Sequence, residues 1–150
     1  MRKILFMALT VILMVAACGN TEGMNEDPDL PGLTVRVGGE EFQAAAGPYC
    51  WRTGNTTSCA DASGDPFGYG DADKPITAAP GSEISFEFDR PPDSFTVLVK
   101  EEAGAEHPSA GPPFQLPEEP GKYGFMVSGE WPQGEVTFLF VVSSTVDASD

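Results

Sequence analysis

The stretch Tyr123–Val142, YGFMVSGEWPQGEVTFLFVV, consists of two alternating segments on either side of a turn signal, Trp131-Pro-Gln-Gly134. The side chains that share one face of each extended segment are large and apolar: Tyr123, Phe125 and Val127 in the first, and Val136, Phe138, Phe140 and Val142 in the second. A period of two residues is typical of half-buried antiparallel strands. Leu139 and Val141 make the other face of the second segment partly apolar as well.

The same period recurs along the rest of the chain. Alternating segments occupy residues 33–37, 41–44, 82–88 and 94–99, with Gly38-Gly39 and Pro91-Pro92-Asp93 as turn signals between neighbours. No helical stripe follows the N-terminal segment, and 14 prolines and 17 glycines interrupt the chain. We therefore predict an all-β fold for residues 32–144, an antiparallel β-sandwich of about seven strands, followed by a polar tail at 145–150.

Several motifs of the last third resemble known domains. Leu116–Tyr123 (LPEEPGKY), Trp131–Gly134 and Phe140–Val142 resemble the closing two strands of immunoglobulin-like or fibronectin-like domains, and Pro120-Gly-Lys-Tyr123 resembles a tyrosine corner. Together with Tyr49-Cys-Trp51, they are similar to uncharacterised lipoproteins of Bacillus-like bacteria. The resemblance implies an immunoglobulin-like sandwich and brings no known activity with it.

The N-terminus has the features of an export signal. Arg2 and Lys3 precede an apolar run, Ile4–Ala17, that is short for a membrane-spanning helix. The end of this run, Val15-Ala-Ala-Cys18, resembles the lipobox of bacterial lipoproteins, in which cleavage before the cysteine is accompanied by acylation, for example with palmitate. The resemblance implies a signal peptide at 1–17, lipidation of Cys18 and attachment to the outer face of the cell membrane. The alternative is a plain secretory signal.

The predicted mature chain is strongly acidic. Without residues 1–17 it has six basic and 23 acidic residues, a formal charge of −17. Nucleic-acid binding needs basic patches that displace counterions, so this class of partner is excluded. Residues 18–31 have four acids and almost no large apolar side chain, and we predict a disordered, solvated tether there.

Cys50 and Cys59 are the remaining cysteines of an exported chain. If Gly54-Asn55 is a two-residue hairpin turn, Cys50 lies opposite Cys59 at a non-hydrogen-bonded pair, where Cα atoms are close enough for a disulfide. Zinc sites and redox pairs use shorter spacings. We predict a structural disulfide, with free thiols as the alternative.

A glycine-rich acidic segment follows the cysteines. Asp61, Asp65, Asp71 and Asp73 lie within residues 60–73, and the spacing Asp61-x-Ser63-x-Asp65 is similar to the start of an EF-hand loop. Pro66 stands where that loop needs glycine, and no glutamate occupies its twelfth position. We predict a solvated connecting loop without a cofactor, and calcium binding through the four aspartates is the alternative.

The sequence offers no catalytic motif. The chain has one histidine, His107, in a Gly/Pro-flanked segment that we expect to be exposed. Nucleophilic catalysis requires a base within hydrogen-bond reach, and no nucleophile motif accompanies this residue.

Two tryptophans are candidates for a binding surface. Trp51 shares a strand face with Tyr49 and is expected to pack in the core. Trp131 precedes Pro132 at a strand end, where we expect it to be partly exposed and available for binding.

These features predict a lipid-anchored, extracytoplasmic binding module without catalytic activity. Its expected partners are the membrane, through the lipid, and an envelope or extracellular protein. The alternative is an inhibitor or accessory subunit of an extracellular enzyme that acts through an exposed loop such as 61–74. An enzyme in its own right is the third hypothesis, which would require His107 and carboxylates to converge in a pocket.

Overall fold

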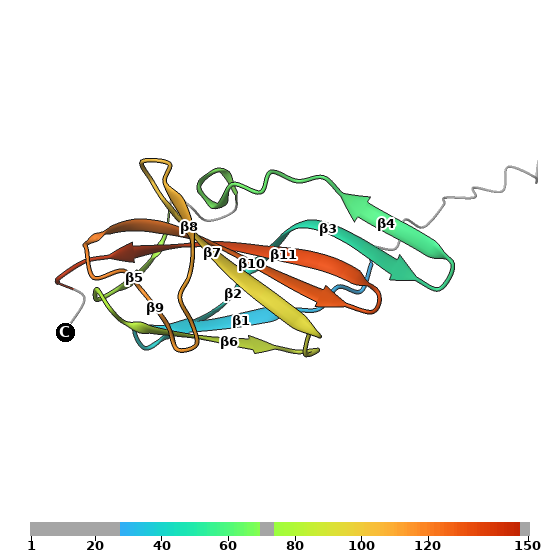
Figure 1. The fold of residues 1–150 in the computed structure, drawn as a ribbon, viewed down its shortest axis with the longest axis horizontal. Coiled ribbons are helices and arrows are strands. Elements are labelled where there is room, and N and C mark those ends of the chain that lie inside the picture. Colours follow the sequence, from blue (N-terminus) through green and yellow to red (C-terminus); the bar gives the residue numbers. More distant parts are fainter. Residues whose placement is uncertain (1–27, 70–73, 148–150) are drawn as a thin grey trace, which may run out of the picture.

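A computed structural model describes residues 28–69 and 74–147, which form a β-sandwich of two packed sheets (Figure 1). The predicted signal peptide, Cys18 and most of the tether lie outside the described residues. The elements are β1 (Leu33–Val37), β2 (Glu40–Gln43), β3 (Ala45–Thr53), β4 (Thr56–Ala60), the 3-10 turn η1 (Pro66–Gly68), β5 (Ile76–Ala78), β6 (Glu83–Phe88), β7 (Ser94–Glu101), β8 (Glu106–Pro108), β9 (Phe114–Gln115), β10 (Gly121–Trp131) and β11 (Gly134–Ser144). The predicted all-β sandwich is confirmed.

The smaller sheet has the strand order β2-β1-β6-β9. β1 pairs antiparallel with both β2 and β6, and Val35 lies opposite Phe42 on one side and Phe86 on the other. The predicted turn at Gly38-Gly39 is present, with φ of 59° and 81°, a region that favours glycine. On the solvent face, Arg36 lies 2.6 Å from both Glu41 and Glu87, so this face is polar.

The larger sheet has the order β4-β3-β11-β10-β7-β8, and β5 also pairs with β11, in the parallel sense. Its centre is the long hairpin of β10 and β11, which pair from Gly121↔Ser144 to Trp131↔Gly134. The hydroxyl of Tyr123 donates a hydrogen bond to the Glu119 carbonyl at 2.8 Å, as a tyrosine corner requires. Burial raises the pKa of this hydroxyl above its ordinary value.

Aromatic rings fill the space between the sheets. Phe125 and Phe140 stack with centroids 4.9 Å apart, and Phe140 meets Phe42 of the opposite sheet edge-on at 5.5 Å. Phe138 is 1% exposed and contacts Phe88 across the same interface. Because these side chains occupy alternate positions of their strands, the period-two pattern of the sequence produces this core directly.

Residues 61–69 cover part of the outer face of the larger sheet, over β10 and β11. Pro66 is buried against Gly124 of β10, and Leu139 and Val141 on this face are 3% and 6% exposed. The Tyr69 hydroxyl donates to the Ala46 carbonyl at 2.7 Å. The segment is therefore packed on the sheet, which differs from the predicted solvated loop because the outward apolar residues of β11 need a cover.

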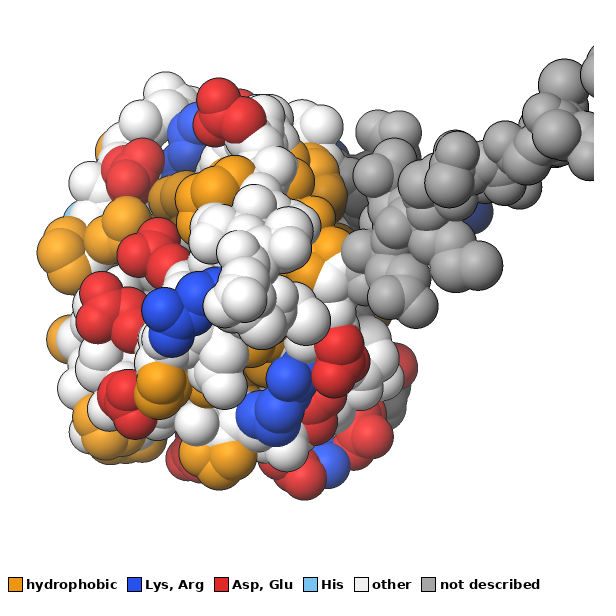
Figure 2. Space-filling view, turned by 90° about the vertical axis from the view of Figure 1, so that its right-hand side faces the viewer, with side chains coloured by type: hydrophobic (Ala, Val, Ile, Leu, Met, Phe, Trp, Pro, Cys, Tyr) orange, Lys and Arg blue, Asp and Glu red, His pale blue; other side chains and the backbone are white. Residues whose placement is uncertain are grey.

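On the end of the domain drawn in Figure 2, hydrophobic side chains lie in small groups between acidic and basic ones. None of the described residues belongs to a helix long and apolar enough to cross a membrane.

The packing of Pro66 on Gly124 is tested by Gly124→Ala. A Cβ at this position would lie 2.3 Å from Cγ of Pro66, so the segment has to move. We expect a loss of about 1–3 kcal/mol in the free energy of unfolding, measured by chemical denaturation.

Gly68→Ala is the matched control, because a Cβ there has no neighbour within 4 Å. It should change the free energy of unfolding by less than about 0.5 kcal/mol. Equal effects of the two substitutions would contradict the packing described for residues 61–69.

Candidate binding groove

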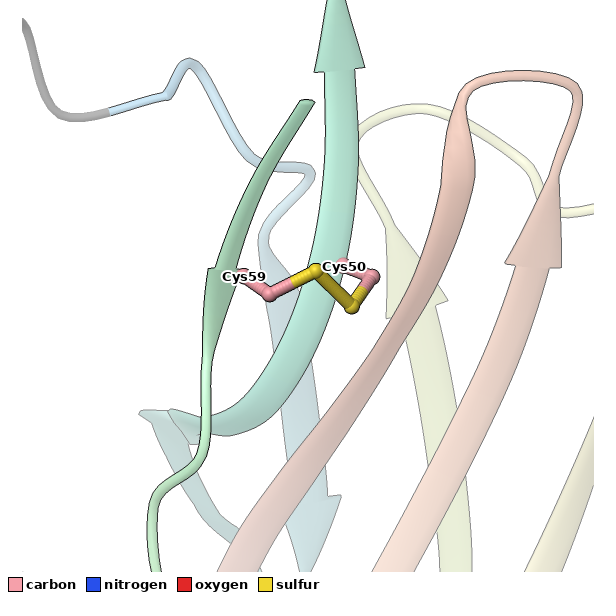
Figure 3. The surroundings of a disulfide bond; sticks show 2 residues. All are labelled: Cys50 and Cys59. Atoms are coloured by element: carbon pink, nitrogen blue, oxygen red, sulfur yellow. A yellow bond between two sulfur atoms is a disulfide. The ribbon is translucent and has the colours of Figure 1, made fainter.

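The predicted hairpin and disulfide are both present. β3 and β4 pair with Cys50 opposite Cys59 and Thr53 opposite Thr56, the register expected from a Gly54-Asn55 turn. The sulfurs are bonded, with Cα atoms 4.1 Å apart, and the bridge lies across the two strands (Figure 3). β4 is an edge strand, so the disulfide fastens the outermost strand of the larger sheet to its neighbour.

The four aspartates proposed for calcium do not all fall within the described residues. Asp71 and Asp73 lie outside them, and Asp61 is exposed. Asp65 accepts a hydrogen bond from the Phe67 amide at 3.1 Å and lies 3.1 Å from the Lys100 ammonium. The Lys100 contact, assisted by this amide, holds the pKa of Asp65 below its ordinary value.

The structure also places His107. His107 is exposed, as expected, but it belongs to the short strand β8, opposite Val99. Within residues 28–69 and 74–147, no group of three or more His, Cys, Asp or Glu side chains is arranged to hold a metal ion.

The expectation that Trp131 is partly exposed is wrong. β10 continues through this residue, so the side chain of Trp131 points into the core on the same face as that of Val127. Trp131 is 8% exposed. Its Nε1 donates to the Arg90 carbonyl at 2.9 Å, and its ring packs edge-on against Trp51 at 5.8 Å. Trp51 is 3% exposed, which confirms its predicted place in the core.

The structure instead reveals a groove at the open side of the sandwich, about 500 Å³ in volume. Its walls come from three elements that are far apart in sequence: β6, the start of β7, and the segment that leads into β9. The lining residues are Glu83, Ile84, Ser85, Phe86, Phe95, Pro112, Pro113 and Phe114.

Three phenylalanines form the apolar surface of this groove. The Phe86 ring lies 5.2 Å from the Phe114 ring and 6.1 Å from the Phe95 ring, and Phe95 lies 5.9 Å from Phe114. Phe95 is 37% exposed, although it belongs to the core-facing side of its strand. Phe86 and Phe95 lie in the alternating segments 82–88 and 94–99 of the sequence, whereas Phe114 lies outside every such segment.

The groove exists because β9 is short. The chain crosses from β8 in one sheet to β9 in the other (Figure 1), and only Gln115 and Phe114 pair with Glu83 and Ile84 of β6. Pro112 and Pro113 have no amide hydrogen, so pairing cannot continue along β6. The Pro-Pro-Phe sequence at 112–114 is the signal from which this short edge strand was predictable.

The direction of the hydrogen bonds along β6 identifies which backbone groups face the groove side. The Asp89 amide donates to Gly32 at 3.1 Å on the β1 side, and Ser82 accepts from the Leu116 amide at 2.9 Å on the β9 side. Because successive residues of a strand point to opposite edges, Phe86 and Phe88 direct their N–H and C=O groups to the β9 side. No described strand pairs with them there.

Fold and groove together define a β-sandwich with an apolar groove beside an unpaired sheet edge. No family model matches the chain, and neither a search of curated proteins nor one of solved structures finds a match.

The contribution of the disulfide is tested by the double substitution Cys50→Ala and Cys59→Ala. Opening a loop of this size should lower the free energy of unfolding by roughly 2.7 kcal/mol, measured by chemical denaturation. Reducing the unmodified protein should give the same loss, whereas Thr57→Ala, an exposed change in the same hairpin, should change it by less than about 0.5 kcal/mol. Unchanged stability of the double variant would show that the bridge does not stabilise the domain.

Proposed function

We propose that the protein is a lipid-anchored binding module that holds a protein partner in the groove between β6 and β7. The observation that supports this most is Phe95, a large aromatic side chain left 37% exposed over two other phenylalanines. The chain has a formal charge of −15, so a surface made of clustered aromatic side chains differs from its otherwise acidic character. Aromatic side chains in such depressions are typical centres of protein–protein interfaces.

The proposed anchor rests on the sequence of residues 1–18, and the described chain begins at residue 28, just ahead of β1. The Arg90 guanidinium donates to the Asp29 carbonyl at 2.7 Å, and Leu30 packs against the core. The chain therefore reaches β1 beside the end of β6. The groove lies toward the other end of β1, since residues 84–86 of β6, which line it, are opposite residues 35–37.

A second candidate, an inhibitor or accessory subunit of an extracellular enzyme, is favoured by the β3–β4 hairpin. Its tip, residues 52–57, is exposed, and the disulfide fixes its two strands. The 61–74 loop proposed from the sequence fits this role less well, since its described part packs on the larger sheet.

The anchor is tested by metabolic labelling of cells with a palmitate analogue. We expect the full chain to incorporate label and to fractionate with membranes, and Cys18→Ser to do neither. A labelled or membrane-bound Cys18→Ser variant would overturn lipidation at this residue.

The groove is tested by placing a photo-crosslinking phenylalanine analogue at Phe95 in intact cells. A crosslinked product of defined mass is expected from this position. The matched control is Thr96, the next residue, which is exposed on the opposite face of β7 and should give no such product.

A third position, Thr53 at the hairpin tip, separates the two candidate functions. Crosslinking from Thr53 but not from Phe95 would favour the inhibitor or accessory subunit. Crosslinking from none of these positions would contradict both.

A further inference from the structure

We propose that the partner contributes an extended segment that pairs with β6 as an added strand, and that this segment alternates basic and large apolar residues. The inference rests on the proposed binding function and states how the groove would be occupied.

The unpaired backbone of β6 is the first reason. Phe86 and Phe88 present N–H and C=O groups at an edge where β9 has already ended. Backbone groups of this kind are a template for another strand, and peptide recognition by strand addition uses them for affinity. The aromatic groove lies directly beside this edge, so side chains of the added strand would have a place to bind.

Strand geometry decides which side chains go where. In a strand next to β6, alternate residues point to the same side as Phe86, toward Phe95 and Phe114, and the residues between them point to the side of Ser85 and Glu87. The first set would fill the groove, and a phenylalanine or valine suits its aromatic walls. The second set would lie on the solvent face of the smaller sheet.

Charge determines the chemistry of that second set. Glu83 and Glu87 lie on this face of β6, and among the described residues Glu83 is the only charged one that lines the groove. Opposite charges across paired strands are stabilising, and like charges are destabilising. Gln115 of β9 already lies opposite Glu83, and Glu87 is paired with Arg36, so basic residues of an added strand would meet these carboxylates as diagonal neighbours, whereas an acidic segment would be repelled.

The test uses the full chain purified from membranes in detergent and a nine-residue synthetic peptide in which lysine alternates with phenylalanine and valine. Affinity is measured by fluorescence anisotropy at physiological salt. A scrambled peptide of identical composition controls for attraction between a cationic peptide and an acidic protein. We expect the alternating peptide to bind at least tenfold more tightly than the scrambled one.

Backbone pairing is tested by methylating amides of the peptide in two sets, on alternate residues. An added strand directs only one set of amides to β6, so one methylated peptide should lose about tenfold or more in affinity and the other should retain it. Hydrogen exchange of the Phe86 and Phe88 amides should slow on binding, whereas the Thr57 and Cys59 amides in the edge strand β4 should not change.

Two protein variants separate this inference from the proposed function. Phe95→Ala should lower the affinity for the alternating peptide about tenfold. Ser85→Lys, an exposed change on the solvent face of β6, should lower this affinity severalfold without disturbing the core. Loss of binding in Phe95→Ala with equal affinities of the two methylated peptides would overturn strand addition and leave the groove as the site. Equal binding of all peptides and variants, with no crosslink from Phe95, would overturn the proposed function as well.

Discussion

The packing of one ring, Phe140, connects most of the structure. This residue lies in the middle of β11, stacks on Phe125 of the neighbouring strand at 4.9 Å, and contacts Phe42 at 5.5 Å and Phe86 at 6.3 Å in the opposite sheet. A sandwich is stable when the inner faces of its sheets interdigitate, and here a single aromatic side chain touches both sheets. Through Phe86, the contact reaches β6, the strand whose open edge borders the groove.

Features set by neighbouring residues in the sequence were predictable. The alternation at Val136–Val142 places large side chains on one face, and the Gly54-Asn55 turn fixes the register that brings Cys50 opposite Cys59. A strand period and a tight turn constrain the backbone within about ten residues, so local patterns suffice. The all-β fold and the disulfide could be inferred for this reason.

Features that depend on distant segments were not predictable in the same way. The exposure of Trp131 depends on how far β10 extends, and strand ends are poorly defined by local pattern. The groove requires residues of β6 and β7 to lie beside Phe114, and no short sequence pattern predicts this contact. The cover over the outer face of β11 comes from the turn η1 at residues 66–68, more than 70 positions before Leu139 and Val141. The sequence pattern therefore predicted an apolar outer face for β11, but it did not predict which segment packs on that face.

The hydrogen bond between Arg90 and the Asp29 carbonyl has a mechanical consequence. It fixes the chain just ahead of β1, one of the two inner strands of the smaller sheet, which is bonded to β2 on one side and to β6 on the other. A force applied through the N-terminal side would act along β1, and the bonds of both ladders run across that direction. They would be loaded together in shear rather than broken one after another. A tether of the proposed kind would therefore pull on a strand that is hydrogen-bonded along both of its sides.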